Sequence, residues 1–365
     1  MEAENYWRLM KETSDRINPL LEEAINSSEC ISKDSTLLEL PRARIENPSK
    51  LRAHTARFVY EAIEKSEGRK PREADWIPLA AASELELISM YYLNQIWDGK
   101  GGCTTKADID KRAVAAGITR NLAFRTLEKG YRGKIDPRKA DELSALLLES
   151  DTVFLEGEYT DIFENTYSSA KAFSFEDMMN LCSKRIYQMN ASFFEKIAQM
   201  AAIASDTKDE KKKEAVKKFG SNLGMLVQIV NDTADFVPEE ENRGTCERYS
   251  SDSYADIKHG KLTYPIIWTL HRGTEEERNK LIEVLERGKL ASSLELENLT
   301  RILVTNEAIN FAISKAKEYA GQAKRELRVF SPEIRAPLSM SCSMAYTNRY
   351  YESLKKIKWQ KKDLL

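Results

Sequence analysis

Residues 219–239 read FGSNLGMLVQIVNDTADFVPE and join an apolar stripe to a group of oxygen-bearing side chains. On a helix, one face would carry Phe219, Leu223, Val227, Asn231 and Asp235, because each lies four residues from the next. That face is apolar where the helix starts and bears amide and carboxylate oxygens where it ends. Such oxygens are the ligands that Mg²⁺ prefers, so the pattern predicts a helix that ends at a metal site. The candidate metal ligands are Asn231, Asp232, Asp235 and Glu239.

A second stretch, residues 79–98, repeats this pattern. It reads LAAASELELISMYYLNQIWD, and one helical face would carry Leu87, Tyr91, Asn94 and Asp98. We expect Asn94 and Asp98 to be further metal ligands, near the C-terminal end of this helix. If the two helices face each other, they enclose an apolar pocket with metal ligands at its mouth. Such a pocket suits a ligand with a hydrocarbon tail and a diphosphate head.

Apolar residues recur at helical spacing along the whole chain, whereas the alternation typical of strands is nearly absent. The 365 residues include 15 Gly and 10 Pro, which is few for this length. We therefore expect an all-α protein, formed by a single domain over residues 1–365. A helix is expected to end at Gly99 and another to start at Pro137, while residues 27–49 are predicted to form a loop.

The composition excludes several classes of protein. Apolar residues make up 42% and charged residues 31%, which excludes a disordered, a collagen-like and a small disulfide-rich chain. The net charge of -2 provides no general attraction to nucleic acid or to acidic membranes. The five scattered cysteines form no CxxC pair, which indicates free thiols in a reducing compartment rather than a zinc site. With no signal-peptide or membrane-spanning pattern, we expect a soluble, cytoplasmic protein.

Residues 256–265 read DIKHGKLTYP and place lysines beside a glycine and a helix start. The N-terminus of a helix and a lysine side chain both attract phosphate groups. Lys258 and Lys261 are therefore candidate contacts for a diphosphate.

The order and spacing of these three segments resemble the trans-isoprenyl diphosphate synthase family, the polyprenyl synthetases. QIVNDTAD (228–235) resembles the second aspartate-rich motif of the family, QxxDDxxD, and DIKHGKLTYP resembles D-L-x-x-G-K-x-T-x-P. Residues 82–98 take the place of the helix that ends in the first motif, DDxxD. Shorter motifs are matched by GEYTD (157–161) and SKLR (49–52). The resemblance covers residues 45–350 and implies the all-α isoprenoid synthase fold, a helical bundle around a deep central cavity.

The resemblance also implies a Mg²⁺-dependent enzyme that ionises an allylic isoprenyl diphosphate. The two motifs would hold the metal, and basic side chains would neutralise the leaving diphosphate. The implied catalytic residues are Asp232, Asp235 and Lys261. The implied substrate-binding residues are Lys50, Arg52, Met90, Tyr91, Gln228, Lys258 and Lys261. The homodimer that is usual in the family is expected too, and isopentenyl diphosphate is left open as a second substrate.

The first motif departs most from the family pattern. Asn94 and Gln95 stand in place of two aspartates, and amides hold Mg²⁺ more weakly than carboxylates do. The arginine pair that follows this motif in the family is missing. Met-Asn at 189–190 replaces the Lys-Thr pair of the central helix, with Lys184 and Arg185 one turn earlier. Several positive charges expected around two diphosphates are therefore absent.

Two other functions stay open on this evidence. Asn231, Asp235 and Glu239 are spaced by four and resemble the metal triad of class I terpene synthases, which need one diphosphate site. The altered first motif also fits a non-catalytic regulatory subunit of a prenyl diphosphate synthase. The length of the substrate tail, the acceptor and metal binding by residues 94–98 are left open as well.

Overall fold

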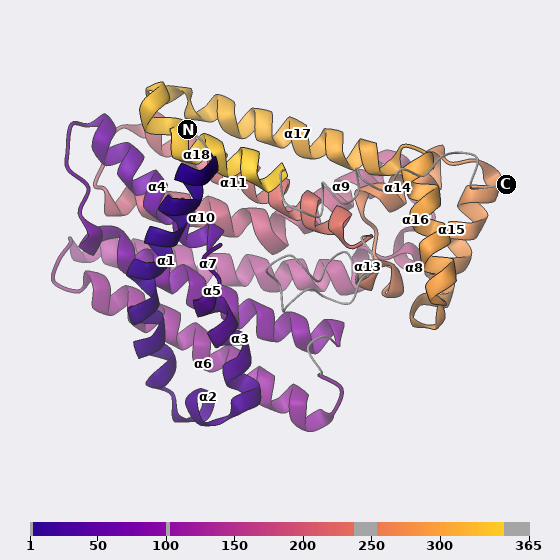
Figure 1. Ribbon diagram of the computed structural model, residues 1–365, viewed down its shortest axis with the longest axis horizontal. Helices are drawn as coiled ribbons and strands as arrows, with labels where there is room; N and C mark the ends of the chain where they lie inside the picture. The colour runs from indigo at the N-terminus through magenta and orange to yellow at the C-terminus, as the bar shows by residue number, and fades with distance from the viewer. Residues whose placement is uncertain (1–2, 100–102, 237–253, 347–365) are drawn as a thin grey trace. The chain divides into compact units, whose positions relative to one another are not determined.

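The chain is helical throughout the residues that the structure describes (Figure 1). The structure is a computed structural model, and it describes residues 3–99, 103–236 and 254–346. Within these ranges the one pairing of extended backbone is an isolated antiparallel bridge between Thr166 and Lys261. The prediction of an all-α protein is confirmed. No helix in the described ranges combines the length and the apolar character that a membrane span requires.

The helices follow one another along the chain in the order shown by the labels of Figure 1. The α-helices are α1 (Ala3–Asn26), α2 (Glu29–Lys33), α3 (Ser35–Glu46), α4 (Leu51–Ser66), α5 (Glu73–Asp98), α6 (Lys106–Tyr131), α7 (Pro137–Tyr159), α8 (Tyr167–Ala170), α9 (Phe175–Ile186), α10 (Ser192–Ala204), α11 (Glu210–Ala234), α13 (Ala255–Lys258), α14 (Tyr264–Arg272), α15 (Glu275–Arg287), α16 (Ser293–Thr305), α17 (Ala308–Glu326) and α18 (Pro332–Tyr346). Two π-helical turns are η1 (Thr160–Glu164) and η2 (Tyr187–Ala191), and two 3₁₀ turns are η3 (Gly288–Leu290) and η4 (Leu327–Val329).

The chain packs as two compact units. Unit 1 comprises Met1–Thr152, Phe193–Ser221 and Ala323–Ser341. Unit 2 comprises Val153–Ser192, Asn222–Gln322 and Cys342–Leu365. Five of the described helices, α7, α10, α11, α17 and α18, contribute residues to both units. The single domain expected over residues 1–365 stays a prediction.

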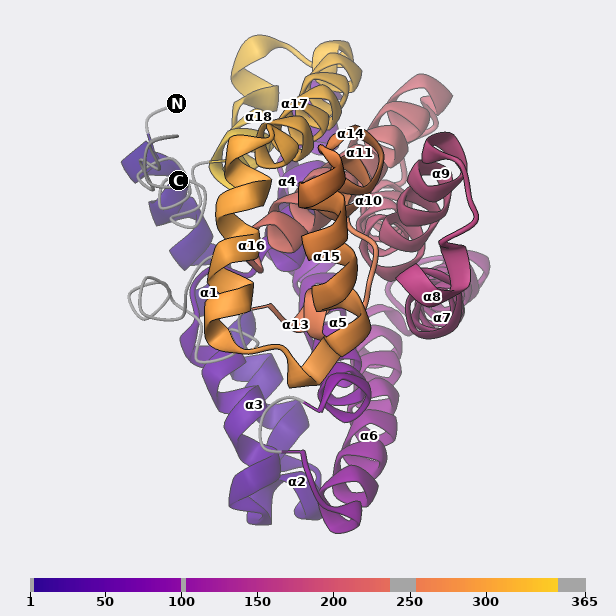
Figure 2. The same cartoon turned by 90° about the vertical axis from the view of Figure 1, so that its right-hand side faces the viewer.

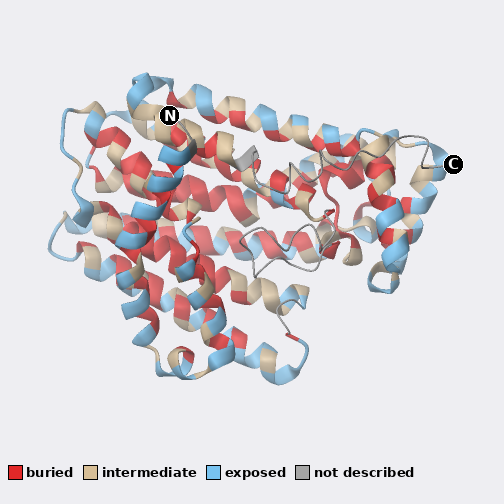
Figure 3. Ribbon diagram, viewed as in Figure 1, coloured by how far each residue is buried: buried red, intermediate tan, exposed pale blue. Residues whose placement is uncertain are grey.

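Helix α5 is buried on all sides along most of its length. Every residue from Pro78 to Met90 is buried, so this part of the helix lies inside unit 1 (Figure 3). Helix α6 runs alongside α5 (Figure 1 and Figure 2). Their crossing requires a glycine, because a Cβ atom at Gly130 would lie 2.1 Å from Cβ of Pro78.

Local sequence sets the end of α5 and the start of α6. Gly99 has a φ of 66°, a left-handed conformation that ends the helix at little cost for glycine. Helix α6 begins with a capping box, in which the side chains of Thr105 and Asp108 each accept a hydrogen bond from the other residue's backbone N–H. The predicted helix end at Gly99 and the predicted helix start at Pro137 are confirmed.

Residues 27–49 form the helices α2 and α3, so the prediction of a loop there is wrong. Ser28 and Asp34 cap these helices, because their side chains accept hydrogen bonds from backbone N–H groups of the first turn. Packing then stabilises α3 although Pro41 lies inside it. The buried apolar side chains include Ile31, Leu37 and Leu40.

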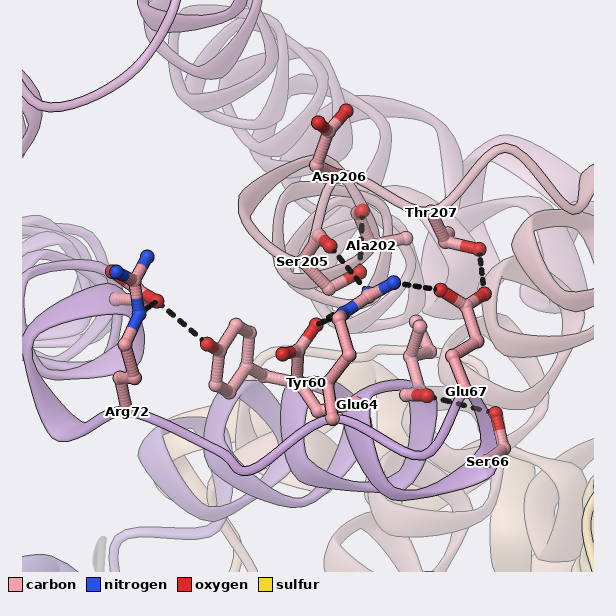
Figure 4. A network of polar contacts seen from close by, with 12 residues as sticks. Tyr60, Glu64, Ser66, Glu67, Arg72, Ala202, Ser205, Asp206 and Thr207 are labelled. Atoms are coloured by element: carbon pink, nitrogen blue, oxygen red, sulfur yellow. Dashed lines mark hydrogen bonds and ion pairs between the residues drawn. The ribbon is translucent and has the colours of Figure 1, made fainter.

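A polar network joins the C-terminal ends of α4 and α10 within unit 1 (Figure 4). Arg69 donates to the carbonyl oxygen of Ser205 at 2.7 Å and also pairs with Glu64. Glu67 accepts a hydrogen bond from the hydroxyl of Thr207. Since the last carbonyls of a helix have no partner within it, Arg69 stabilises the end of α10.

In unit 2, helices α14, α15 and α16 pack against one another (Figure 2). The indole N–H of Trp268 in α14 donates to the carbonyl oxygen of Asn306, just after α16, at 2.9 Å. The π-helical turn η1 follows α7, and η2 follows α9. Such turns are rare and are frequent at functional sites.

Two glutamates of α5 lie in the core of unit 1, each beside an arginine. Glu84 is 2.6 Å from Nε of Arg44. Glu86 is 4.0 Å from Nε of Arg120, and Arg120 also pairs with Asp151 at 2.7 Å. Two carboxyl groups therefore share one guanidinium. Burial, and next the charge of Asp151, raises the pKa of Glu86 to about 8.

The raised pKa predicts a loss of stability with rising pH. Between 4.5 and about 8, the folded chain binds more protons at Glu86 than the unfolded chain does, so the free energy of unfolding falls as pH rises. Glu86→Gln removes this penalty and should raise the free energy of unfolding at about pH 8 by roughly 2–4 kcal/mol, with little effect near pH 5. Urea denaturation at both pH values measures the difference.

Glu142→Gln is the matched control, because Glu142 is exposed on α7 in the same unit. It should change the free energy of unfolding little at either pH. An effect of Glu86→Gln that is equal at the two pH values would contradict the assignment of a buried, protonated Glu86.

Candidate functional site

The first motif occupies the last turn of α5, in unit 1. Oδ1 of Asn94 is buried and has no hydrogen-bond partner within the described ranges, so this oxygen is available to a ligand. Gln95 accepts a 2.9 Å hydrogen bond from Nε of Arg112, a buried residue of α6. Asp98 is half-buried at the last position of the helix.

Lys50 secures the turn before α4. Its ammonium group is buried and donates to the hydroxyl of Ser14 and to the carbonyl oxygens of Ile45 and Asn47. These three hydrogen bonds use all its donors. Burial lowers the pKa of Lys50 to about 8. In this arrangement the side chain binds the protein itself, and its predicted contact with substrate stays a prediction.

Arg52 has a different environment, on the first turn of α4. Its guanidinium lies 5.5 Å from the ring centroid of Phe193 and 4.9 Å from that of Phe194. Burial lowers the pKa of Arg52, whereas Tyr91 and Glu84 act in the opposite direction. Arg52 and Tyr91, both predicted to bind substrate, are therefore neighbours in unit 1. Met90, the residue before Tyr91, is buried.

Four buried charged side chains form a continuous chain in unit 2. Lys261 pairs with one carboxylate oxygen of Asp161, and the other oxygen lies 3.7 Å from Nε of Arg185. Nη2 of Arg185 lies 2.5 Å from Asp232. The exposed fractions of Lys261, Asp161, Arg185 and Asp232 are 7%, 1%, 2% and 5%. Because the charges alternate, each buried ion has a partner of opposite sign.

The charge chain joins three segments that the sequence singled out. Asp161 ends GEYTD, Asp232 lies in NDTAD, and Lys261 lies in DIKHGKLTYP. The backbone supports the arrangement, since the N–H of Leu262 donates to the carbonyl oxygen of Asn165 at 2.9 Å. The segments are therefore held together by backbone hydrogen bonds as well as by ion pairs.

Gly157 lets η2 approach the end of α7 closely. A Cβ atom at this position would lie 2.8 Å from Cβ of Gln188 and 2.9 Å from the backbone nitrogen of Met189. The hydroxyl of Thr160 then donates to Oε1 of Gln188 at 3.1 Å. The two π-helical turns are thus in direct contact within unit 2.

Asp235 follows the end of α11 and caps the short helix α13. Its two carboxylate oxygens accept hydrogen bonds from the N–H groups of Ala255 and Asp256, each at 3.1 Å. Asp235 thereby positions the segment that carries Lys258, which is half-buried. Each carboxylate oxygen has a second lone pair, so capping leaves Asp235 able to bind a cation.

The remaining predicted ligands of unit 2 differ in exposure. Asn231 is exposed, whereas Asp232 is buried and accepts a 2.7 Å hydrogen bond from Gln228. Glu239 lies outside the described residues. In the described part of the chain, no group of three or more His, Cys, Asp or Glu side chains is placed to hold a metal ion.

Asp232 and Arg185 form a tightly coupled pair. Burial raises the pKa of Asp232 to about 6, while Arg185 acts in the opposite direction. Burial lowers the pKa of Arg185, but the charges of Asp232 and other neighbours outweigh it and raise this pKa well above its usual value. At neutral pH both partners are therefore ionised.

The family of the chain follows from a match to a family model that includes the GEYTD, NDTAD and DIKHGKLTYP segments. The family model described as polyprenyl synthetase matches residues 101–303, more than half of the chain. The chain belongs to the polyprenyl synthetase family. The resemblance predicted from the motifs is confirmed.

Curated relatives of this family member match part of its length. The geranylgeranyl diphosphate synthase of Saccharolobus solfataricus is 27% identical over 210 residues, which cover 56% of this chain and 57% of the relative. The short chain isoprenyl diphosphate synthase of Methanocaldococcus jannaschii is 26% identical over 215 residues, 57% of this chain and 60% of the relative. The matched region thus spans less than two thirds of these relatives.

Solved structures match nearly the whole chain. The polyprenyl synthase from Caulobacter crescentus CB15, complexed with calcium and isoprenyl diphosphate, has a TM-score of 0.74 at 17% identity and covers 95% of this chain and 98% of that one. The geranylgeranyl pyrophosphate synthetase from Pyrococcus horikoshii Ot3 has a TM-score of 0.72 at 18% identity and covers 94% and 98%. These likenesses confirm the predicted isoprenoid synthase fold.

Sequence reasoning missed the role of two arginines of this polyprenyl synthetase. Arg112 contacts Gln95 of the first motif, and Arg185 contacts Asp232 of the second. Arg185 lies one turn before the position where the family has Lys-Thr, so the sequence indicated a basic side chain in this region. No signal pointed to Arg112, because it lies on a different helix from the motif that it contacts.

The charge chain predicts a large effect of a single substitution. Asp161→Asn removes the one carboxylate that lies between two buried cations, Lys261 and Arg185. We expect the free energy of unfolding to fall by about 3–5 kcal/mol, because two buried cations then face each other without the carboxylate between them. Denaturant unfolding at neutral pH measures this change.

Glu164→Gln provides the control, since Glu164 lies in the same π-helical turn and pairs with Lys184 at the surface. Its effect should stay below about 1 kcal/mol. Equal effects of the two substitutions would show that the buried chain does not stabilise unit 2.

Proposed function

We propose that this polyprenyl synthetase is an enzyme that acts on an allylic isoprenyl diphosphate with the help of Mg²⁺. The observation that carries the proposal is the family match, which includes the NDTAD and DIKHGKLTYP segments. The curated relatives named above are themselves isoprenyl diphosphate synthases. A transferase reaction, in which a second prenyl diphosphate or another acceptor attacks the allylic carbon, is the proposed chemistry.

In each motif, the donor oxygens fit a Mg²⁺ ion that is held together with a diphosphate. Mg²⁺ is commonly held by one or two carboxylates together with substrate phosphates and water, rather than by a cage of protein ligands. Asn94 has a buried oxygen without a partner, and Asn231 is exposed. We propose Asn94 and Asp98 in unit 1, and Asn231 and Asp235 in unit 2, as the ligands. Glu239 stays a predicted ligand.

Bound metal would polarise the diphosphate and stabilise the negative charge that develops on it. The chain's own basic residues would share this task. Lys258 and Lys261 lie on the segment that Asp235 positions, and Arg52 is the basic residue of unit 1 that we retain for the diphosphate. The bond between the allylic carbon and oxygen breaks with its electron pair on the diphosphate. Met90 and Tyr91 would contact the hydrocarbon and exclude water.

The homodimer and the cytoplasmic location stay predictions. Some large apolar side chains of unit 1 are exposed. They include Ile109 and Val114 on α6 and Leu148 on α7.

The acceptor is tested by product analysis of the purified chain. We expect Mg²⁺ and geranyl, farnesyl or geranylgeranyl diphosphate to yield a longer diphosphate when isopentenyl diphosphate is added, as read by mass spectrometry. A hydrocarbon or alcohol formed without isopentenyl diphosphate would make the chain a terpene synthase. No product in any mixture would contradict the proposal and favour a regulatory subunit.

The metal ligands are tested by single substitutions at accessible positions. Asp98→Asn and Asn231→Ala should each lower kcat by on the order of 100-fold, because several kcal/mol of stabilisation of the leaving diphosphate are lost. Both positions are partly or fully exposed, so the melting temperature should change little. Asn298→Ala, an exposed amide of α16, is the control and should leave kcat unchanged. Full activity of either motif variant would remove that residue from the proposed ligands.

A further inference from the structure

The first and second motifs have the same arrangement of residues, which is recognised only when the two are compared. The first reads NQIWD over residues 94–98 and the second NDTAD over residues 231–235. Both begin with Asn and end with Asp four residues later. At the second position of each motif, a side chain oxygen receives a hydrogen bond from a buried arginine.

Each arginine comes from a different helix than the motif that it contacts. In unit 1, Arg112 of α6 is 5% exposed, and its Nε donates to Oε1 of Gln95 at 2.9 Å. In unit 2, Arg185 of α9 is 2% exposed and contacts Asp232 at 2.5 Å. Buried arginines are uncommon because burying a guanidinium is costly unless its donors are used. Two of them at equivalent motif positions therefore call for a shared explanation.

Helix geometry supplies that explanation. In the first motif, Asn94 and Asp98 lie on one face of α5, since they are four residues apart, whereas Gln95 is turned by about 100°. In the second motif, Asp235 follows the end of α11, but its N–H still donates to the carbonyl oxygen of Asn231 at 3.2 Å, which continues the helical turn. A link from the second residue to a neighbouring helix thus prevents rotation of the motif about its own axis. The direction in which Asn94 and Asp98, or Asn231 and Asp235, present their oxygens is then determined.

We propose that Arg112 and Arg185 are matched positioning residues, which hold Gln95 and Asp232 so that the flanking Asn and Asp side chains can bind a metal–diphosphate complex. Asp232 is then a positioning residue and not a metal ligand. The inference rests on the proposed function and assigns roles within the same two motifs. It also explains why the second position tolerates Gln in one motif and Asp in the other, because both side chains have an oxygen that accepts from arginine.

The test measures binding of Mn²⁺, in the presence of inorganic pyrophosphate, to the full chain by electron paramagnetic resonance. Arg185→Met should weaken Mn²⁺ binding by about 10- to 100-fold, the usual effect of losing a partner that orients a ligand. The double variant Arg185→Met/Asp232→Leu should return to within about three-fold of the unsubstituted chain, since an apolar pair can replace a buried ion pair. Arg112→Met and Arg112→Met/Gln95→Leu form the equivalent pair in unit 1.

The two readings of Asp232 predict opposite results. If Asp232 were a metal ligand, Arg185→Met would remove a competing cation and strengthen Mn²⁺ binding, and the double variant would bind weakly. Either result overturns the inference while the proposed function stands. The inference is also overturned if Mn²⁺ affinity falls only in parallel with the melting temperature and does not recover in the double variants. The arginines would then act through packing alone.

Matched controls separate these effects from a change of surface charge. Lys184→Met removes a surface cation next to Arg185, and Lys106→Met removes one at the start of α6. Neither should change Mn²⁺ affinity. If the unsubstituted chain binds no Mn²⁺ with pyrophosphate, the proposed function and the inference both fail.

Discussion

The ion chain Lys261–Asp161–Arg185–Asp232 is the interaction on which unit 2 depends, because it joins segments far apart in the sequence. All four side chains are almost fully buried. Each charge there lies beside one of the opposite sign, and the removal of Asp161 or Arg185 interrupts the chain between its two ends. The contact between the π-helical turns and the short bridge at Lys261 both lie close to this chain.

The same constraint operates in unit 1 with different residues. Helix α5 is buried from Pro78 to Met90, yet it carries Glu84 and Glu86 there, and an arginine from another helix lies beside each of them. Arg44 pairs with Glu84, while Arg120 lies close to both Glu86 and Asp151. Arginine suits this role because its planar group has several donors in a fixed arrangement and stays charged when buried. The pair of Arg44 and Glu84 therefore joins α3 to the buried part of α5.

The position of the first motif at the end of α5 is relevant to the metal binding that we propose for its altered residues. The first motif has two carboxylates fewer than the family pattern, but Gln95 is fixed twice, because its carbonyl oxygen accepts from the N–H of Gly99 and its side chain accepts from Arg112. Well-positioned oxygens bind a cation more tightly than mobile ones, because less conformational entropy is lost on binding. In the proposed metal site, precise placement would compensate in part for the weaker ligands, with the diphosphate supplying further oxygens.

The sequence by itself determined the helical class, the family and the two motif stripes, because these depend on spacing within one helix and on residue type. It also located the helix boundaries at Gly99 and Pro137, where the backbone preference of a single residue decides. It was wrong for residues 27–49, since capping and burial outweighed a turn-like composition. Only the tertiary structure decided that Lys50 binds the protein's own carbonyls, that Asp235 caps α13 and that Asp232 is paired with Arg185. These roles depend on which side chains of distant segments meet, and a pattern along one segment does not encode its partners.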